Sequence, residues 1–381
     1  MMHVADQRAI YLDFNASTPL APEVAKAMEQ ALRGPFGNPS SDHWAGQTAR
    51  EAVDKARAQV AGLLGCKPHE IVFTSGGSES NNHAVKGAFF THGKNGTHII
   101  TSQVEHPAII NPCRFLEGLG AEVTYLPVDG FGQVDPDDVR RAITSQTVLI
   151  SIMHANNEVG TIQPIAAIAQ IARERGILFH TDAAQSVGKI STRIEELGVD
   201  LLSIAGHKLY GPKGIGALYV RGGLQLEPLI HGAGHESGRR AGTENILLDL
   251  GLGAACELAQ VWIGMESVRE LRDLFWNLLQ EEFGVGVVLN GHPEERLPNT
   301  VNVSFVGKVG SEILSHMKGV AASTGSACHS GSVQLSPVLK AMKLDPQVGM
   351  GAIRFSLGRT TTREEIEATM LLLANATSVP S

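Results

Sequence analysis

A lysine at the end of an apolar segment is the residue of this chain best suited to covalent chemistry. Lys208 follows an apolar run over residues 201–205 that is typical of a buried strand. Because lysine is rarely buried without a partner, its amine is expected to be bound to another group. A Schiff base to pyridoxal phosphate fits, since partial desolvation lowers the pKa of an amine and frees its lone pair. A lysine in a surface loop is the other interpretation of this segment alone.

A second strand-like run, over residues 177–180, leads to Asp182 and, three residues further on, to Gln185. Enzymes that use pyridoxal phosphate as an electron sink need an acidic partner for the ring nitrogen, and a carboxylate at a strand end suits that task. The amide of Gln185 is placed to turn towards the phenolic oxygen of the ring. Both residues favour the Schiff-base interpretation of Lys208.

A glycine turn within residues 73–82 joins a strand to the start of a helix. Main-chain N–H groups at a helix N-terminus bind phosphate, and Gly77 and Ser78 stand at that start. A glycine turn by itself is usually no more than a turn. A phosphate-binding turn, a strand-end aspartate and a strand-end lysine in this order are far more specific, and together they indicate a pyridoxal phosphate site.

These residues belong to a series of motifs that runs through almost the whole chain. The motifs occupy residues 11–17, 36–41, 75–80, 104–106, 156–160, 181–185, 206–213, 239–245, 326–328 and 353–359. With them the chain resembles the group I cysteine desulfurases, the nitrogenase-associated and housekeeping type, within the class V aminotransferase-like family. The resemblance implies a pyridoxal 5'-phosphate enzyme of fold type I that converts L-cysteine to L-alanine. It also implies that sulfur passes, as a persulfide, to an acceptor such as an iron–sulfur scaffold protein.

Cys328 is the residue that would take the sulfur. It lies in a run of small residues with two glycines, over residues 321–332, which predicts a mobile loop. A partly exposed thiolate on such a loop is able to approach a bound substrate and then leave. An unreactive surface cysteine is the alternative. Cys66 and Cys256 lie in apolar helical stretches typical of a core, and Cys113 shows no partner.

The resemblance assigns roles to two further polar residues near the cofactor. His106 would lie over the pyridine ring and move protons, whereas a histidine that caps or packs against the following helix is the alternative. Asn157 would hydrogen-bond a cofactor oxygen or the substrate carboxylate, with a turn asparagine as the alternative.

Three further residues are assigned to the substrate and to the phosphate. Arg354 would bind the α-carboxylate of the substrate, because a guanidinium fork matches a carboxylate. A cross-strand ion pair is the alternative for Arg354, and Arg359 is the rival residue for the carboxylate. His207 would donate to the phosphate unless it is a simple loop histidine. By resemblance Thr243 reaches the phosphate of the neighbouring subunit, which implies a homodimer with shared active sites.

Departures from the family pattern leave the substrate open. Ala205 replaces a common serine and removes a phosphate hydroxyl, and Ser78 stands where threonine is common. His329 after the cysteine, with the run at residues 336–339, is similar to selenocysteine lyases. Alternatives are therefore a selenocysteine lyase, an aminotransferase or other lyase in which Cys328 is incidental, and a non-catalytic protein that kept the fold.

Composition and overall sequence features argue against several other classes of protein. The 381 residues carry a net charge of −8, which gives no basic footprint for nucleic acid. No apolar run approaches about 18 residues, so no membrane span is expected. No secretory signal is visible at the start, and the four cysteines have neither CxxC nor zinc-like spacing. No metal site is expected, and a reducing, cytoplasmic setting is the default.

Hydrophobic patterning predicts an α/β fold. Continuous apolar strands over residues 98–101, 122–126, 148–153 and 177–180 alternate with helical stretches, which favours a mostly parallel sheet covered on both faces. Ligands of such sheets bind at the carboxyl ends of strands. A helical stretch over residues 247–283 leads to a smaller α+β part. The predicted domains are residues 17–260, which bind the cofactor, and residues 1–16 with 261–381, which carry the cysteine loop.

Overall fold

A seven-stranded sheet forms the centre of the computed structural model, which describes residues 9–93, 96–324, 328–329 and 332–378. The strand order is β2-β8-β7-β6-β5-β3-β4. The strands are β2 (Ile71–Thr74), β3 (His98–Ser102), β4 (Glu122–Leu126), β5 (Thr147–Ser151), β6 (Leu178–Asp182), β7 (Leu201–Ala205) and β8 (Gly216–Val220). Strands β7 to β4 are parallel, whereas β8 runs antiparallel to β7 and β2. The predicted α/β class with a mostly parallel sheet is confirmed.

Helices cover both faces of this sheet. They are α1 (Pro22–Leu32), α2 (Trp44–Leu64), α3 (Gly77–His92), α4 (Pro107–Glu117), α5 (Pro136–Ala142), α6 (Ile165–Arg175), α7 (Ile194–Leu197) and α8 (Ile246–Trp262). Ile99 and Leu149 are buried with residues of α3 and α4, while their neighbours Ile100 and Ile150 are buried with residues of α2, α6 and α8. Successive side chains of a strand point to opposite faces of the sheet, so a continuous apolar strand packs against the helices on both faces.

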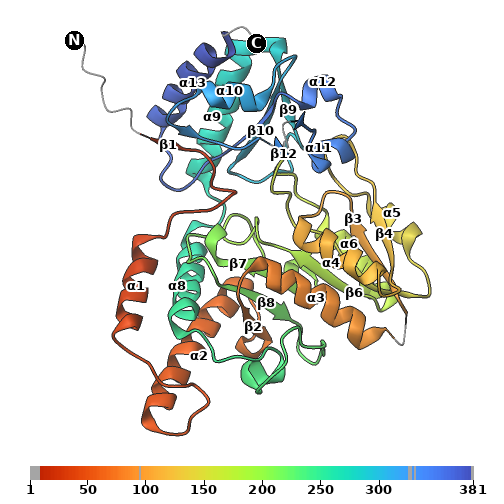
Figure 1. The fold of residues 1–381 in the computed structure, drawn as a ribbon, viewed down its shortest axis with the longest axis vertical. Coiled ribbons are helices and arrows are strands. Elements are labelled where there is room, and N and C mark those ends of the chain that lie inside the picture. Colours follow the sequence, from red (N-terminus) through yellow and green to blue (C-terminus); the bar gives the residue numbers. More distant parts are fainter. Residues whose placement is uncertain (1–8, 94–95, 325–327, 330–331, 379–381) are drawn as a thin grey trace.

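A second hydrophobic core lies above the sheet in Figure 1, and it contains residues from both the start and the end of the described chain. Its antiparallel strands have the order β14-β10-β9. The elements are β9 (Val287–Asn290), β10 (Thr300–Phe305), β14 (Ala352–Ser356), α9 (Glu266–Phe283), α10 (Gly310–His316), α11 (Pro337–Ala341), α12 (Pro346–Gly349) and α13 (Arg363–Ser378). β1 (Ile10–Tyr11) pairs in parallel with β11 (Val320–Ala321), and Ile10 is buried in this core. The bounds of the two predicted domains stay a prediction.

Two details differ from the sequence analysis. The helical stretch over residues 247–283 is two helices, α8 and α9, because Gly264 and Met265 have φ angles of +92° and +43° that no α-helix contains. β4 is half-exposed rather than buried, since it is the edge strand of the sheet.

No single helix among the described residues has the length and apolar character needed to cross a membrane. One pair, Ile246–Trp262 with Glu266–Gly286, meets that test by length and composition only when its two helices are taken together, and they are bent by 70°.

The backbone around Cys328 forms a short strand pair where the sequence analysis predicted a loop. β12 (Cys328–His329) is antiparallel to β13 (Ser332–Val333). The side chains of Cys328 and His329 lie outside the described part of the chain, and the mobility of this segment stays a prediction.

Candidate active site

A cavity of about 700 Å³ opens where the carboxyl ends of β6 and β7 meet the N-terminus of α3. It brings together nine of the eleven residues singled out in the sequence: Gly77, Ser78, His106, Asn157, Asp182, Gln185, His207, Lys208 and Arg354. The first eight lie on the seven-stranded sheet and its connections, whereas Arg354 comes from β14 of the second core. The cavity therefore lies between the two cores.

Lys208 stands in a single 3-10 turn, Gly206–Lys208, directly after β7. Its amine donates to the main-chain oxygens of Asn15 at 2.5 Å and Ala16 at 2.8 Å. Burial lowers the pKa of Lys208 to about 8, helped by the nearby Arg354 charge and opposed by Asp13 and Asp182. Roughly a tenth of this amine is thus uncharged at pH 7, far more than for a lysine of ordinary pKa, and the uncharged form is the one that Schiff-base chemistry requires.

Asp182 is the last residue of β6, and its carboxylate is buried. Asn81 Nδ2, from α3, donates to one oxygen at 2.7 Å, and the N–H of Ala184 donates to the other at 2.9 Å. These two hydrogen bonds fix the orientation of the carboxylate, and a carboxylate is the partner that a protonated ring nitrogen needs. Asn81 lines the cavity as well and was not singled out in the sequence.

The turn before α3 is shaped for an anion. Gly76 has a φ of +147°, and a Cβ on Gly77 would lie 3.1 Å from the Cβ of Ala205, so glycine lets the turn approach β7 closely. The first N–H groups of α3 have no acceptor within their own helix and favour a phosphate there. His207 also lines the cavity, 3.4 Å from Ser17 Oγ, and burial lowers its pKa to about 4, so its imidazole is neutral.

His106 both caps α4 and lines the cavity. Its Nδ1 accepts the N–H of Ala108 at 3.1 Å, so the neutral ring carries its proton on Nε2. Burial lowers its pKa, an effect opposed by Asp182 and reinforced by Lys208. The capping interpretation is thus confirmed, and a position on the cavity wall accompanies it.

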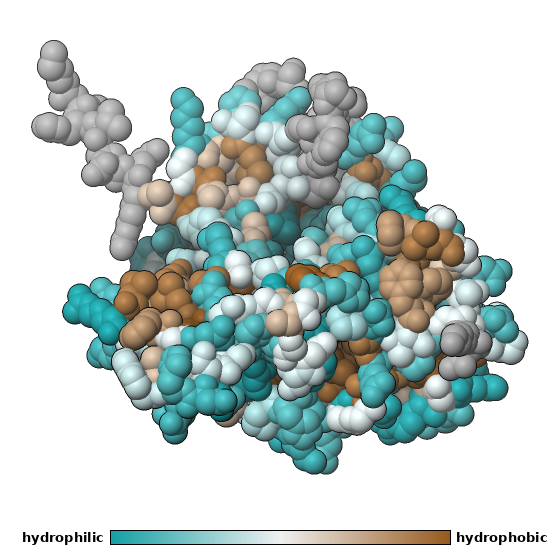
Figure 2. Space-filling view, turned by 60° about the horizontal axis from the view of Figure 1, so that its bottom comes forward, coloured by the Kyte–Doolittle hydropathy of each residue, from teal (hydrophilic) through white to brown (hydrophobic). Residues whose placement is uncertain are grey.

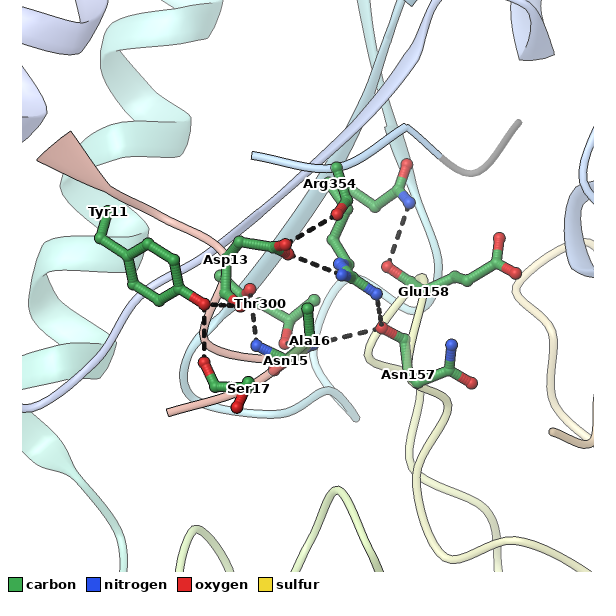
Figure 3. A network of polar contacts seen from close by, with 12 residues as sticks. Tyr11, Asp13, Asn15, Ala16, Ser17, Asn157, Glu158, Thr300 and Arg354 are labelled. Atoms are coloured by element: carbon green, nitrogen blue, oxygen red, sulfur yellow. Dashed lines mark hydrogen bonds and ion pairs between the residues drawn. The ribbon is translucent and has the colours of Figure 1, made fainter. Parts of the chain in front are cut away.

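Arg354 is held between two partners on the cavity wall (Figure 3). Its Nη2 lies 2.7 Å from Asp13 Oδ1, and its Nη1 donates to the main-chain oxygen of Asn157 at 2.9 Å. Its Nε has no hydrogen-bond partner among the described residues. Its rival Arg359 lies instead over the rings of Tyr210 and Trp262, at 5.1 and 4.4 Å, beside a second cavity of about 20 Å³ that shares Lys208 with the main one.

Among the predicted residues whose side chains the structure describes, Thr243 is outside the lining of the main cavity; the side chain of Cys328 is not among those described. Thr243 lines a neighbouring cavity of about 240 Å³, which shares Ser75, Gly214 and Ile215 with the main one. A role for Thr243 across a subunit interface stays a prediction.

Asn15 is the residue of this site that sequence reasoning missed most clearly. It is buried, and its main-chain oxygen accepts from Lys208 and from Gln185 Nε2, the latter at 2.9 Å. Its Oδ1 accepts from Lys189 Nζ at 3.0 Å. The predicted amide of Gln185 therefore faces Asn15 in this structure. The motif at residues 11–17 was noticed, but only the fold brings it next to Lys208.

The description of the family named Aminotransferase class-V matches residues 10–369. The chain belongs to this family. A protein named cysteine desulfurase IscS from Dictyoglomus turgidum is 51% identical over 371 residues, which are 96% of this chain and 94% of that protein. A solved structure described as a NifS-like protein matches with a TM-score of 0.90 and 36% identity, over 97% of this chain and 99% of the other. Another, described as SspA in complex with cysteine, matches with a TM-score of 0.81 and 40% identity, over 91% and 98%.

Class-V aminotransferases use pyridoxal phosphate, and the described residues fit that group. The α3 turn suits its phosphate, the carboxylate of Asp182 suits its ring nitrogen, and the amine of Lys208 suits its aldehyde. Among the described residues no group of three or more histidine, cysteine, aspartate or glutamate side chains is arranged to hold a metal ion.

Proposed function

We propose that the chain is a pyridoxal phosphate-dependent cysteine desulfurase that converts L-cysteine to L-alanine and takes up the sulfur on Cys328 as a persulfide. The observation that carries the proposal is the 700 Å³ cavity in which Lys208, Asp182 and the α3 turn converge. The name of the Dictyoglomus turgidum relative and the cysteine complex of the SspA structure support L-cysteine as the substrate.

Each residue of the cavity has its own role in the proposed reaction. The cofactor, when bound, supplies an electron sink for the bonds at Cα. Lys208 removes and returns the Cα proton, since an amine with a pKa of about 8 exists in both protonation states near neutral pH. Asp182 keeps the ring nitrogen protonated. His106, whose imidazole is neutral and lines the cavity, is placed to move protons beside it.

The sulfur transfer balances without any external oxidant or reductant. The Cβ–S bond of cysteine breaks, an S–S bond to Cys328 Sγ forms, and Cβ gains the proton that makes alanine. Cysteine plus one thiol thus gives alanine plus one persulfide. The persulfide is then passed to an acceptor, for which an iron–sulfur scaffold protein is our proposal, in keeping with the IscS name of the relative.

Arg354 is proposed to hold the α-carboxylate of the substrate. Its Nε is free of partners among the described residues, and its Nη1 donates only to a neutral carbonyl, so both can serve an incoming carboxylate. The side chain of Asn157 lies on the same wall and is the second proposed contact. Arg359 is engaged with aromatic rings and is assigned no substrate.

Two molecules of the chain are proposed to form a homodimer with shared active sites. Leu32, Phe36 and Trp44 are 71%, 79% and 73% exposed, and the last two rings contact each other with centroids 6.0 Å apart. Figure 2 shows hydrophobic residues gathered in patches on the face that it presents. Exposed apolar groups of this size are typical of interaction surfaces. A partner contacting the cavity beside Thr243 would complete the phosphate site.

A cytoplasmic location is part of the proposal. The described cysteines Cys66, Cys113 and Cys256 are free thiols. Free thiols are the usual state of cysteine in reducing compartments.

One experiment tests the function against its alternatives. The purified chain, loaded with pyridoxal phosphate, is given L-cysteine with a reductant, and alanine and sulfide are measured; parallel samples receive L-selenocysteine. We expect equal amounts of alanine and sulfide from cysteine. Release of selenide with no release of sulfide would instead support a selenocysteine lyase. Protein that takes up no cofactor would support the non-catalytic alternative.

A further inference from the structure

Lys189 is a second lysine beside the site, and its side chain is buried. Its amine donates to Asn15 Oδ1 at 3.0 Å and to Gln185 Oε1 at 3.1 Å. Both acceptors are neutral amide oxygens, and burial lowers the pKa of Lys189 well below its ordinary value, with Lys208 and Arg354 adding to the effect. An uncharged amine has two N–H groups, which equals the number of these acceptors. The two hydrogen bonds therefore do not depend on a charge.

Both residues that accept hydrogen bonds from Lys189 are connected to the main-chain oxygen that Lys208 binds. Gln185 Nε2 donates to the main-chain oxygen of Asn15 at 2.9 Å, and Lys208 donates to that same oxygen. The side-chain Nδ2 of Asn15 is held in turn by Thr300 Oγ1 at 2.9 Å (Figure 3). Lys189, Gln185 and Asn15 thus form a closed set of hydrogen bonds around one carbonyl.

We propose that Lys189 is a positioning residue: through Asn15 and Gln185 it fixes the carbonyl that binds the Lys208 amine. The proposal rests on the proposed role of Lys208 in holding pyridoxal phosphate.

The direction of each amide supports this assignment. The Lys189 amine donates to Oδ1 of Asn15 and to Oε1 of Gln185, so both amide oxygens face it. Asn299 Nδ2 also donates to Oδ1 of Asn15, at 3.1 Å, whereas Oε1 of Gln185 accepts from Lys189 alone among the described residues. That leaves the Nε2 of Gln185 free to donate to Asn15. Without Lys189 the Oε1 of Gln185 loses this donor, and the direction of the amide then rests on its one remaining hydrogen bond, to the Asn15 carbonyl.

The test uses Lys189→Met, which keeps the length of the side chain and removes its donors. Lys86→Met is the matched control, because Lys86 lies over the ring of Phe115, outside the cavities described here. Each apo protein is mixed with pyridoxal phosphate, and the rate at which borohydride-fixable cofactor appears on Lys208 is measured by peptide mass spectrometry. The loss of both hydrogen bonds is expected to lower this rate roughly tenfold or more relative to wild type. Lys86→Met is expected to match the wild type.

A mutant cycle with the pair Asn15→Ala and Gln185→Ala, which removes both acceptors of Lys189, separates positioning from general stability. If Lys189 acts through these two residues, adding Lys189→Met to the pair slows cofactor fixation no further. Additive losses would overturn the proposal, and so would a wild-type rate for Lys189→Met. If Lys189→Met does not fold, Lys189→Gln, which keeps two N–H donors, must retain a rate nearer to wild type than Lys189→Leu does. A wild-type protein that fixes no cofactor on Lys208 would instead contradict the proposed function.

Discussion

Asp13 links Arg354 to the segment that carries Cys328. One carboxylate oxygen lies 2.7 Å from Arg354 Nη2, and the other accepts from Ser323 Oγ at 2.9 Å. Ser323 and Arg354 are also joined by a pair of main-chain hydrogen bonds, of 2.7 and 3.1 Å. The proposed substrate arginine and the residue five positions before the cysteine therefore share one acidic partner. A substrate carboxylate at Nε or Nη1 of Arg354 would therefore share the guanidinium with Asp13, which contacts Nη2.

Replacing Arg354 tests whether it holds the substrate. Hydrogen bonds to charged groups contribute about 1.5–3 kcal/mol, so Arg354→Met is expected to lower kcat/KM for L-cysteine by roughly 10- to 150-fold. Arg359→Met is the control, because Arg359 contacts Tyr210 and Trp262 rather than the cavity. It should lower the free energy of unfolding by about 0.5–1 kcal/mol and leave KM nearly unchanged. The opposite result for the two arginines would assign the carboxylate to Arg359.

The pKa of Lys208 sets the pH dependence of cofactor uptake. Only the uncharged amine attacks an aldehyde, and burial, followed by the charge of Arg354, lowers this pKa from 10.5 to about 8. The rate of covalent uptake by the apo protein should therefore rise with pH through a midpoint near 8. Arg354→Met removes one lowering cause and should move the midpoint upward. A wild-type midpoint near 10.5 would show that the protein does not lower the pKa of the Lys208 amine.

Asp182→Asn tests the acid partner of the cofactor. The variant should still take up pyridoxal phosphate on Lys208, because it keeps the cavity and the amine. Loss of the charged partner is expected to slow exchange of the Cα proton of cysteine with solvent by roughly 100- to 10,000-fold, measured by deuterium incorporation. Asp200→Asn is the control, a buried carboxylate that accepts from Phe179 N and pairs with Arg221, away from the cavity. Near-normal exchange in Asp182→Asn would show that Asp182 is not the acid partner of the cofactor.

Sequence reasoning found the residues whose role depends on local position. Asp182 and Lys208 stand at strand ends, and parallel strands bring their carboxyl ends to one edge, so their meeting in one cavity was predictable. The glycine turn at Gly77 was predictable for the same reason, since it begins a helix directly after a strand.

The residues that sequence reasoning missed depend on contacts between distant segments. Asn15 meets Lys208 across 193 positions, and Arg354 meets Asp13 across 341. Lys189 lies between Gly188 and Ile190, and its sequence neighbours do not indicate which groups accept its hydrogen bonds. The break at Gly264 was missed because the apolar spacing of the two helices continues across it.

The persulfide on Cys328 is the central claim of the proposed function. Burial raises the pKa of Cys66, Cys113 and Cys256 to about 12, so these thiols hold little thiolate at neutral pH and are poor sulfur acceptors. Cys328→Ala should therefore abolish sulfide release from cysteine. It should leave cofactor uptake unchanged, and measurable selenium release from selenocysteine should remain, because selenium leaves more readily.

The most direct measurement is peptide mass spectrometry of the cofactor-loaded wild-type protein after a single mixing with L-cysteine and no reductant. The account predicts one added sulfur on the peptide that contains Cys328, together with an equal amount of alanine. Added sulfur on Cys66, Cys113 or Cys256 instead, or alanine formation that survives Cys328→Ala, would contradict it.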